Sequence, residues 1–409
     1  MKETALIPNL FRTEYSKIVA VLCKSFGIEH MPMAEDITSD TFLQAAETWG
    51  LKGLPENPTA WLYRVAKNKA IDFLRRNKIY TDKVIPAING EKDDTEEQVD
   101  LSAQNITDSQ LQMMFAICDP CISAEAQIGL SLNILCGFGA EEIADAFLTN
   151  KETIYKRLNR AKEKLRAQKV AIALPSSAGI NDRLQNVLTT LYLLFSEGYY
   201  SASQNTGLRK ELCIEAMRLN LMLIENNATN TPAANALLSL MCFHSSRFDA
   251  RTNPHGEIIL YDNQDEQLWN TILIEKGEHY LNLAATGNQL TKYHLEAAIA
   301  YWHTQKKDTT EKWEQILQLY NKLLQLEYSP IAALNRTYAL SKANGKPAAI
   351  IEAEKLQLTD NHLYHSLLGN LYSDIDNDKA VKHFNTALSL AKTWAQRSTI
   401  ARNIDRLVK

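Results

Sequence analysis

The stretch EEIADAFLTNKETIYKRLNRAKEKL, from Glu141 to Leu165, decides the fold because it carries two helical patterns separated by a short break. Apolar residues recur at helical spacing on both sides of the break, at Ile143, Ala144 and Phe147 and then at Ile154, Leu158, Ala161 and Leu165. Thr149 followed by Glu152 fits a capping box, so we expect the second helix to begin near Asn150. Leu148 lies in the break between the two helical patterns. A tight turn between two helices often has a glycine at this position.

The second of these helices is strongly basic. Between Lys151 and Lys169 there are eight Lys or Arg residues and two acids, whereas the whole chain has a net charge of −4. Two short helices, a tight turn and a basic second helix are typical of a helix-turn-helix whose second helix enters the major groove. A solvated basic face on a core helix is the alternative. The side chains expected to face DNA are Thr153, Lys156, Arg157, Asn159, Arg160 and Lys164.

Length and composition favour a helical protein of several domains. The 409 residues are enough for two or three domains, and glycine and proline are sparse. We predict an all-α chain with two small domains at 1–79 and 109–170, an acidic flexible linker at 80–108, a second linker at 171–184 and a long helical region at 185–409. No apolar run approaches the ~20 residues of a membrane helix, and no signal peptide is evident, so we expect a cytoplasmic protein without membrane contact.

The sequence offers no sign of catalysis or of a cofactor. Cys118 and Cys121, with Cys136 further on, invite a metal or redox site, but no fourth ligand lies nearby in the sequence. Phosphate-binding glycine loops and the common hydrolase and metalloprotease motifs are missing from the sequence. We therefore expect no enzyme, no metal and no cofactor.

A second basic segment lies in the first domain. Residues 60–78, AWLYRVAKNKAIDFLRRNK, form an amphipathic helix with six cations against Asp72 alone, and the loop Gly50–Thr59 precedes it. A loop beside a basic helix can hold an unstacked base. Further upstream, Asp36 and Asp40 lie one turn apart at the start of AEDITSDTFLQAAETW. Acids that complement the helix dipole are the alternative explanation for this pair.

These motifs, taken in order, resemble a bacterial RNA polymerase sigma factor of the extracytoplasmic-function class. The resemblance rests on an AED-x-x-x-x-TF helix, a P-x-x-P-T-A-WLYRVAKN-x-A-x-D-x-LRR helix, an acidic linker and a basic helix-turn-helix that ends RAKEKLR. It covers residues 8–168, including both predicted domains and their linker.

The resemblance implies a role for each segment. The partners would be core RNA polymerase, through its clamp helices and flap, and promoter DNA, both double-stranded and melted. The clamp helices would be bound by Asp36, Asp40 and Phe42. The −10 element would be read and opened by Lys52, Asn57, Trp61, Asn68, Lys69, Asp72, Arg75 and Arg76. The helix from Asn150 to Arg166, with the DNA-facing side chains named above, would read the −35 element.

The C-terminal half resembles the extension found on a subset of these sigma factors. LLGNLYSDIDNDKAVKHFNTALSLA, Leu367–Ala391, is similar to a tetratricopeptide repeat, with Leu368, Gly369 and Tyr372 on one helix and Ala380, Phe384 and Ala387 on the next. We interpret this half as a regulatory module that binds a protein partner or a ligand. Packing support for the promoter-binding domains is the alternative.

Two other functions stay open. A one-component transcription regulator would bind an operator through the helix-turn-helix and sense a signal through the helical half, but this leaves the Ala34–Lys78 arrangement unexplained. A helical-repeat scaffold leaves both basic helices unexplained.

Overall fold

The computed structural model describes residues 6–84, 99–176, 179–200, 206–251, 259, 261–391 and 394–408. Within these ranges every regular element is a helix, which confirms the all-α prediction. The chain divides into two compact units, Met1–Thr229 and Asn230–Lys409, and each is described by itself.

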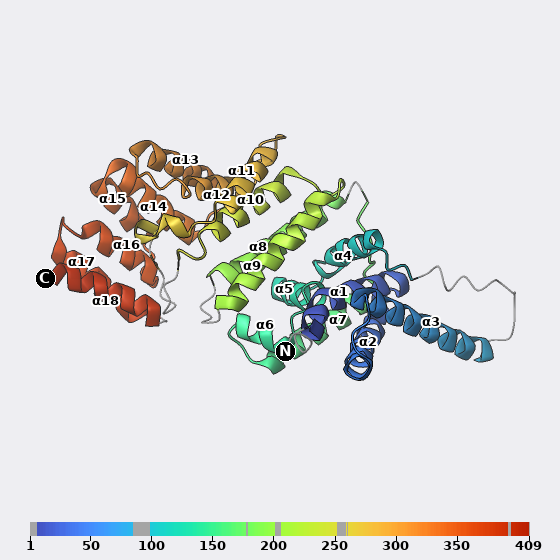
Figure 1. The fold of residues 1–409 in the computed structure, drawn as a ribbon. Helices are drawn as coiled ribbons and strands as arrows, with labels where there is room; N and C mark the ends of the chain where they lie inside the picture. The colour runs from blue at the N-terminus through green and yellow to red at the C-terminus, as the bar shows by residue number, and fades with distance from the viewer. Residues whose placement is uncertain are drawn as a thin grey trace. The chain divides into compact units, whose positions relative to one another are not determined.

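The first unit contains nine α-helices in its described residues (Figure 1). They are α1 (Leu6–Phe26), α2 (Met31–Lys52), α3 (Pro58–Val84), α4 (Ala103–Ile117), α5 (Ala124–Leu130), α6 (Ala140–Ala146), α7 (Lys151–Ala167), α8 (Ile180–Tyr200) and α9 (Thr206–Glu225). A π-helical turn at Ser131–Leu135 follows α5 directly. Side-chain caps start several of these helices: Ser102, Ser123 and Asn150 each accept a hydrogen bond from a backbone N–H of the first turn.

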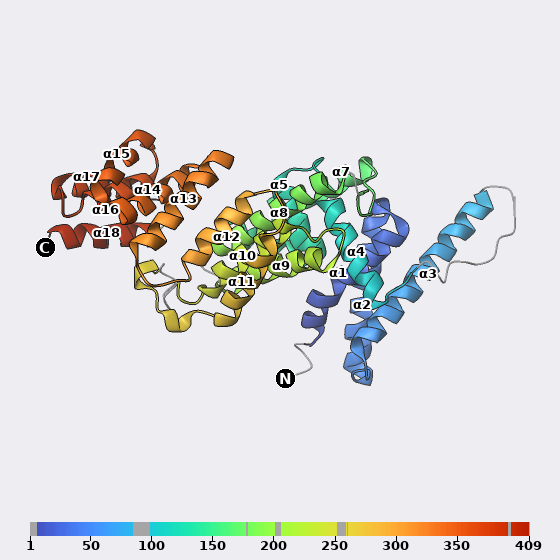
Figure 2. The same ribbon diagram turned by 90° about the horizontal axis from the view of Figure 1, so that it is seen from above.

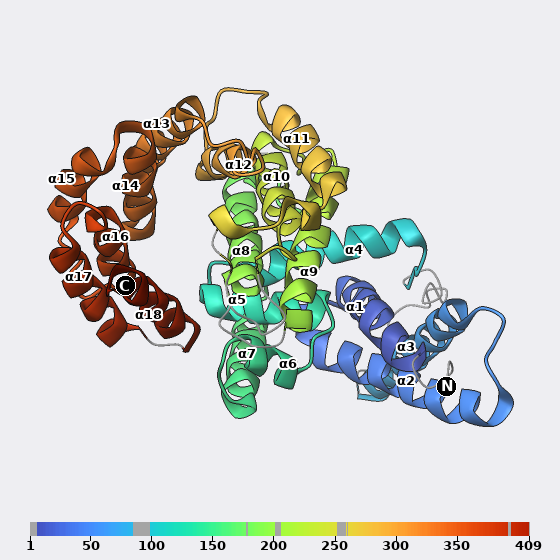
Figure 3. The ribbon, with the colours of Figure 1, turned by 60° about the vertical axis from the view of Figure 1, so that its left-hand side comes forward.

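Helix α1 is the centre of this unit. All six residues of Ile18–Cys23 are at most 1% exposed. Helices α2, α3 and α4 and the Ser131–Leu135 turn pack on α1, which lies between α2 and α4 in Figures 1 and 3. Lys24 donates a hydrogen bond to Asn105 of α4 at 2.9 Å. A helix that is buried on all sides needs neighbours on all sides, so both predicted N-terminal domains contribute to a single core.

The acidic linker is shorter than predicted. Helix α3 continues to Val84 and α4 already begins at Ala103, so both ends of the predicted 80–108 linker are helical. Val99 is fully buried, and Asp100 accepts hydrogen bonds from the backbone and hydroxyl of Ser102, each at 2.9 Å. Residues 85–98, which hold most of the acids, lie outside the described residues.

Helices α8 and α9 form a hairpin that packs on α4, α5 and α6. A Cβ on Gly198 would lie 2.8 Å from the carbonyl oxygen of Arg209, so glycine permits the close approach of the two helices. Arg183 donates hydrogen bonds to Asp119 and to the carbonyl of Phe115, each at 2.7 Å. Helix α8 begins at Ile180, inside the predicted 171–184 linker, and the hairpin belongs to the first unit rather than to the remainder of the extension.

The second unit is a succession of helices, each of which packs on its neighbours in sequence (Figures 2 and 3). Its described helices are α10 (Pro232–Ser246), α11 (Thr271–Ala284), α12 (Lys292–Trp302), α13 (Thr310–Leu326), α14 (Pro330–Asn344), α15 (Lys346–Leu356), α16 (His362–Tyr372), α17 (Asn377–Leu390) and α18 (Trp394–Val408). Two 3-10 turns, Tyr261–Asn263 and Glu266–Leu268, precede α11.

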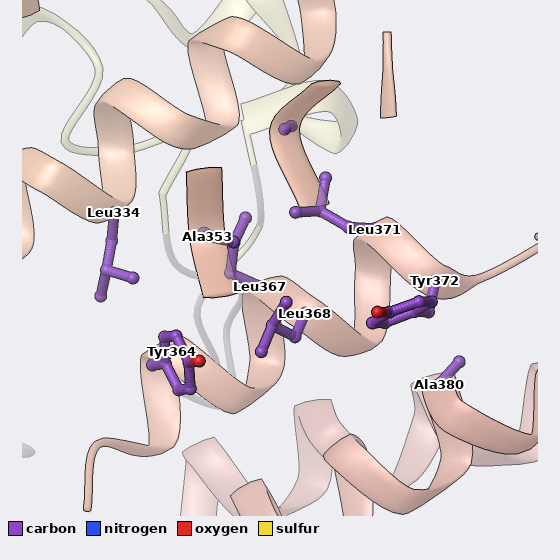
Figure 4. Close-up of a cluster of buried hydrophobic side chains, with 9 residues drawn as sticks. Leu334, Ala353, Tyr364, Leu367, Leu368, Leu371, Tyr372 and Ala380 are labelled. Carbon is purple, nitrogen blue, oxygen red and sulfur yellow. The ribbon is translucent and has the colours of Figure 1, made fainter. Parts of the chain in front are cut away.

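The segment that resembles a tetratricopeptide repeat forms the α16–α17 pair. Leu368 and Tyr372 belong to a cluster that also takes in Leu334, Ala353 and Ala380 from neighbouring helices (Figure 4). Phe384 of α17 is 1% exposed and packs over Gly369 of α16, where an added Cβ would lie 2.7 Å from the ring. Glycine at this position therefore sets how closely the two helices approach.

We predict that Gly369→Ala destabilises the second unit, because the new methyl group overlaps the buried Phe384 ring. Overpacking of this kind costs about 1–3 kcal/mol. Hydrogen exchange monitored by mass spectrometry should show weaker protection of α16 and α17. Gly50→Ala is the matched control, since nothing lies within 4 Å of the methyl group it would add in α2. Unchanged protection in Gly369→Ala would mean that the ring moves aside freely.

Candidate nucleic-acid interface

Helix α2 carries an exposed acidic stripe. Asp36 and Asp40 lie one turn apart and both are exposed, the Asp40 side chain by 67%. The opposite face of α2 is buried, with Ala34, Thr38 and Ala45 at 1% exposure or less. The structure therefore leaves both predicted polymerase-binding carboxylates available to a partner.

Phe42 does not share this surface. It is 4% exposed, and its ring lies 5.0 Å from that of Phe11 and 6.4 Å from that of Tyr15. Phe42 belongs to the apolar stripe of α2 with Ile37, and this stripe packs on α1. The Phe42 side chain holds α2 against α1, and its contact with the polymerase stays a prediction.

Helix α3 presents a polar stripe along one face. Asn68, Asp72 and Arg76 are exposed and follow one another four residues apart, and the exposed Arg75 lies three residues after Asp72, so all four share one side of the helix. The buried positions Leu62, Ala66 and Ala70 form the opposite face. Among the predicted −10 residues, these four form one continuous surface.

Lys69 lies at the edge of the α3 stripe and links it to α2. Its ammonium nitrogen is 3.9 Å from a carboxylate oxygen of Asp40, and the two side chains are 31% and 67% exposed. An ion pair with this exposure contributes little to stability. It does show that the predicted polymerase-binding surface and the predicted −10 surface are adjacent.

The three remaining −10 residues lie around the loop before α3. Lys52 is exposed in the last turn of α2. The side-chain oxygen of Asn57 accepts a hydrogen bond from the backbone N–H of Ala60 at 3.0 Å, so Asn57 caps α3 as well as facing solvent. Trp61 is partly buried and meets Trp49 edge to face, with ring centroids 5.3 Å apart. Only part of the Trp61 ring is therefore free to stack on a base.

A buried carboxylate fixes α3 on α1, and the sequence analysis missed it. Glu14 is 7% exposed and accepts hydrogen bonds from Lys17, at 2.9 and 3.1 Å, and from the hydroxyl of Tyr63. Burial and the hydrogen bond to Glu14 raise the pKa of Tyr63, so its hydroxyl stays a donor. The α3 stripe is thereby held at a fixed position along α1.

Helices α6 and α7 are joined by a turn whose geometry differs slightly from the prediction. Asn150, rather than Thr149, caps α7 by accepting a hydrogen bond from the N–H of Thr153 at 2.8 Å. Leu148 has a φ of 49°, in the left-handed region that glycine favours. The N–H groups of Thr149 and Leu148 bond to the carbonyls of Ala144 and Asp145, so Leu148 takes the usual glycine position of a Schellman helix end.

Helix α7 separates its apolar and basic faces. Ile154, Leu158, Ala161 and Leu165 are buried, as the periodicity predicts. Thr153, Lys156, Asn159, Arg160 and Lys164 are exposed, whereas Arg157 is partly buried. Hydrogen bonds from the backbone and from the Ser123 side chain lower the pKa of Glu125, and the charge of the nearby Arg157 lowers this pKa further. Of the predicted −35 residues, Arg157 is therefore the least available.

The flank of α7 next to Asn159 contacts the first helices of the chain. Lys162 forms an ion pair with Glu35 of α2, with side chains 14% and 24% exposed. Beside this pair is a cavity of about 380 Å³ lined by aromatic residues of α1, Phe11 and Tyr15, by Tyr155 and Asn159 of α7, and by Phe138. No local sequence pattern indicates the pairing of Lys162 with Glu35, and the one available signal is that Lys162 directly follows the buried Ala161.

Arg12 extends the contact between α1 and the helices that follow. Its guanidinium lies 2.9 Å from a carboxylate oxygen of Glu211 in α9 and 3.6 Å from one of Glu142 in α6. The same group lies over the Phe138 ring at 4.2 Å. Arg12 thus connects three segments that are far apart in the sequence.

The cysteines of the first unit lie in positions that favour the protonated thiol. Burial raises the pKa of both Cys118 and Cys121 to about 11, so neither is a thiolate near neutral pH. In the part of the chain that the structure describes, no three His, Cys, Asp or Glu side chains are grouped to hold a metal ion. No helix in the described ranges is long and apolar enough to span a membrane.

Two protein families match parts of the chain. Residues 10–79, which span most of α1 to α3, match sigma-70 region 2. Residues 183–285, from α8 to the end of α11, match a family of unknown function, DUF6596. The acidic stripe of α2 and the polar stripe of α3 both lie inside the region 2 match.

A full-length relative carries the comparison across the chain. An uncharacterized protein of Rhizobium meliloti (strain 1021) is 30% identical over 384 residues, which cover 92% of this chain and 90% of the relative. The chain therefore belongs to the same family as this Rhizobium meliloti protein, and it carries a sigma-70 region 2 at its N-terminal end and a DUF6596 region further along.

Proposed function

We propose that the chain is a sigma factor of the extracytoplasmic-function class, which binds core RNA polymerase and directs it to promoters. In this account α2 docks on the clamp helices of the polymerase, and α3 with the loop before it reads and opens the −10 element. Helices α6 and α7 form a helix-turn-helix that contacts the flap and reads the −35 element. The chain performs no chemistry of its own.

The observation that carries the proposal is the agreement between the region 2 match and the exposed surfaces of α2 and α3. Within residues 10–79 the inner faces of α2 and α3 are buried, with Ala34 and Ala45 in α2 and Leu62, Ala66 and Ala70 in α3 at 1% exposure or less. The charged residues Asp36, Asp40, Arg75 and Arg76 are exposed. Acids on one helix suit a basic protein partner, and cations on the next suit the phosphates of DNA. Adjacent surfaces of this kind fit a protein that brings a polymerase and a promoter together.

The exposed face of α7 supports the second DNA contact. Lys156, Arg160 and Lys164 lie outside the buried stripe, and Asn150 caps the helix end that would point toward a phosphate. Arg160 has the forked donors that read guanine in the major groove. Because Arg157 is partly buried, Arg160 is the stronger candidate for base recognition.

For the C-terminal half we propose two roles in two places. The α8–α9 hairpin supports the DNA-binding helices, because Arg183, Thr190 and Arg218 bond to the α4–α5 region and to the turn after it. The tetratricopeptide-like helices of the second unit act as the regulatory module and bind a protein partner or a ligand. In this proposal the hairpin provides the packing support, and the remaining helices provide the regulation.

The runner-up is a one-component regulator that binds an operator without polymerase. The exposed basic face of α7 fits this function equally well. An operator-binding regulator, however, would have no use for the acidic stripe of α2, which lies inside the region 2 match. Dependence on core polymerase separates the two functions.

We predict that Asp36→Lys with Asp40→Lys strongly weakens polymerase binding, because like charges then face each other across the interface. Such contacts cost several kcal/mol, and every ~1.4 kcal/mol is a tenfold loss of affinity. Affinity for purified core, measured by fluorescence anisotropy of the labelled chain, should fall at least about 100-fold. Both side chains are exposed, so helical content should not change.

A matched control changes the charge of the chain equally. Glu311→Lys with Glu314→Lys reverses two exposed acids of α13 in the second unit. This variant should bind core like the wild type. If the α2 variant forms the holoenzyme normally, the acidic stripe is not the polymerase contact.

We predict that Arg160→Ala and Lys164→Ala weaken promoter binding by the holoenzyme in different ways. Loss of a base-reading arginine costs about 1–3 kcal/mol and relaxes specificity at one position. Loss of a phosphate contact weakens binding to all sequences and lowers the salt slope by about 1. Promoter fragments selected by the holoenzyme itself, titrated over a salt series, provide the measurement. Equal losses on specific and random DNA for Arg160→Ala would reduce that residue to a phosphate contact.

A further inference from the structure

The second unit holds a group of cations and aromatic rings around the turn that begins at Tyr261. The rings of Tyr261 and Trp269 lie 6.4 Å apart and are tilted by 31°. His303 meets Tyr261 edge to face, with ring centroids 5.1 Å apart. We call Arg247, Tyr261, Trp269, His303 and Lys306 the Tyr261 cluster; its residues come from the end of α10, the turns before α11 and the segment after α12.

Three cations surround these rings. The guanidinium carbon of Arg247 lies 5.5 Å from the centroid of Tyr261 and 5.9 Å from that of Trp269. The ammonium of Lys306 lies 5.6 and 5.7 Å from the same two centroids. Lys312, which is 2% exposed, places its ammonium 5.0 Å from Tyr261. Cation–π contacts of this kind stabilise a cation but do not neutralise its charge.

In the described part of the chain, no carboxylate balances the charges of Arg247 and Lys306. Arg247 is 7% exposed, and within the described residues no acid lies within 4 Å of it or of Lys306. Lys306 donates to the carbonyls of Gln264, at 2.6 Å, and Tyr261, at 3.4 Å, which leaves one of its three donors unused by these bonds. The nearby Asp308 pairs instead with Lys342 at 3.4 Å. An arginine is seldom buried this deeply without an anionic partner.

Four polar atoms in this place are buried without a hydrogen bond to any residue that the structure describes. They are Nε of Arg247, Nε1 of Trp269, Nδ1 of His303 and Oε1 of Gln264. Each orphaned atom carries a desolvation cost, so native structures leave few of them. Two of the four are N–H donors with no acceptor, which a bound oxygen atom would supply. Oε1 of Gln264 is an acceptor, so it requires a hydrogen-bond donor instead.

The behaviour of His303 agrees with a positive local field. Burial, followed by the charges of Arg247 and Lys312, lowers the pKa of His303 to about 3. His303 is therefore neutral near pH 7, and the positive charge of the cluster lies on Arg247 and Lys306, with Lys312 beside it. Lys306 is only half-buried, so the cluster reaches the surface at this side chain.

We propose that Arg247, Lys306 and Trp269 form a binding site for the oxyanion group, phosphate or carboxylate, of a small molecule that also carries a hydroxyl or amino group. The oxyanion accepts hydrogen bonds from the guanidinium, the ammonium and the indole N–H. The hydroxyl or amino group donates to Oε1 of Gln264. Most of these residues lie within the DUF6596 match, and the site goes beyond polymerase and promoter binding.

The experiment uses the full chain labelled with 5-fluorotryptophan, which reports on the six tryptophans by fluorine NMR. Trp269→Phe assigns the Trp269 resonance. Sodium phosphate, sodium sulfate and sodium acetate are titrated separately against sodium chloride at equal ionic strength. We expect a saturable shift of the Trp269 resonance with phosphate or acetate that chloride does not produce. Saturation by phosphate and sulfate alone identifies a tetrahedral anion, and saturation by acetate alone identifies a carboxylate.

Charge variants then test which residues bind the anion. Arg247→Gln should raise the apparent dissociation constant at least about tenfold, in line with the loss of a charged hydrogen bond. Arg336→Gln removes the same charge from α14, where Arg336 bonds to Asn321 and Glu352, and should change it less than about twofold. The titration of the wild-type chain tests whether the site binds an anion even if Arg247→Gln fails to fold. A Trp269 resonance that moves equally in chloride, or does not saturate with any anion, would overturn the site.

Discussion

The burial of Ile18–Cys23 on every side of α1 is the constraint on which the first unit depends. These six residues are at most 1% exposed to solvent. They are covered by α2 and α3, by α4 and by the turn after α5. Arg12, Glu14 and Lys24 add polar contacts along the same helix to α9, α3 and α4. Any change that moved α4–α7 away from α1–α3 would expose the apolar face of α1 to water, at a cost that grows with the area exposed.

This constraint also places the two proposed binding surfaces in one compact body. The acidic stripe of α2 and the basic face of α7 are connected by the Glu35–Lys162 pair, and Asn159 lines the cavity beside it. Thr153, Lys156, Arg160 and Lys164 remain exposed in this arrangement. Most of the side chains proposed to recognise DNA are therefore available while the Glu35–Lys162 pair is formed. Asn159 is the exception, because it lines the same cavity as Phe11 and Tyr15 of α1.

Local sequence patterns predicted the elements well but could not predict how they meet. The buried face of α7 follows from a 3.6-residue period, and the Phe384–Gly369 contact follows from the same kind of pattern in α16 and α17. Thr149 and Asn150 are both good caps, so the sequence alone could not choose between them. The apolar pattern of α2 does not tell a core residue from an interface residue at Phe42, and the structure shows that this side chain is buried. Glu35 and Lys162 are 127 positions apart, and nothing local indicates their pairing.

Transcription by purified components tests the central claim most directly. DNA fragments are first selected by their binding to the mixture of core RNA polymerase and the full chain. The selected fragments are then transcribed by the same mixture, and the run-off products are measured. The account predicts transcripts with one defined start that require both the chain and core, and that are lost when Asp36 and Asp40 are replaced by lysine. Retention of the same fragments by the chain alone, with no transcript when core is added, would contradict it and identify an operator-binding regulator instead.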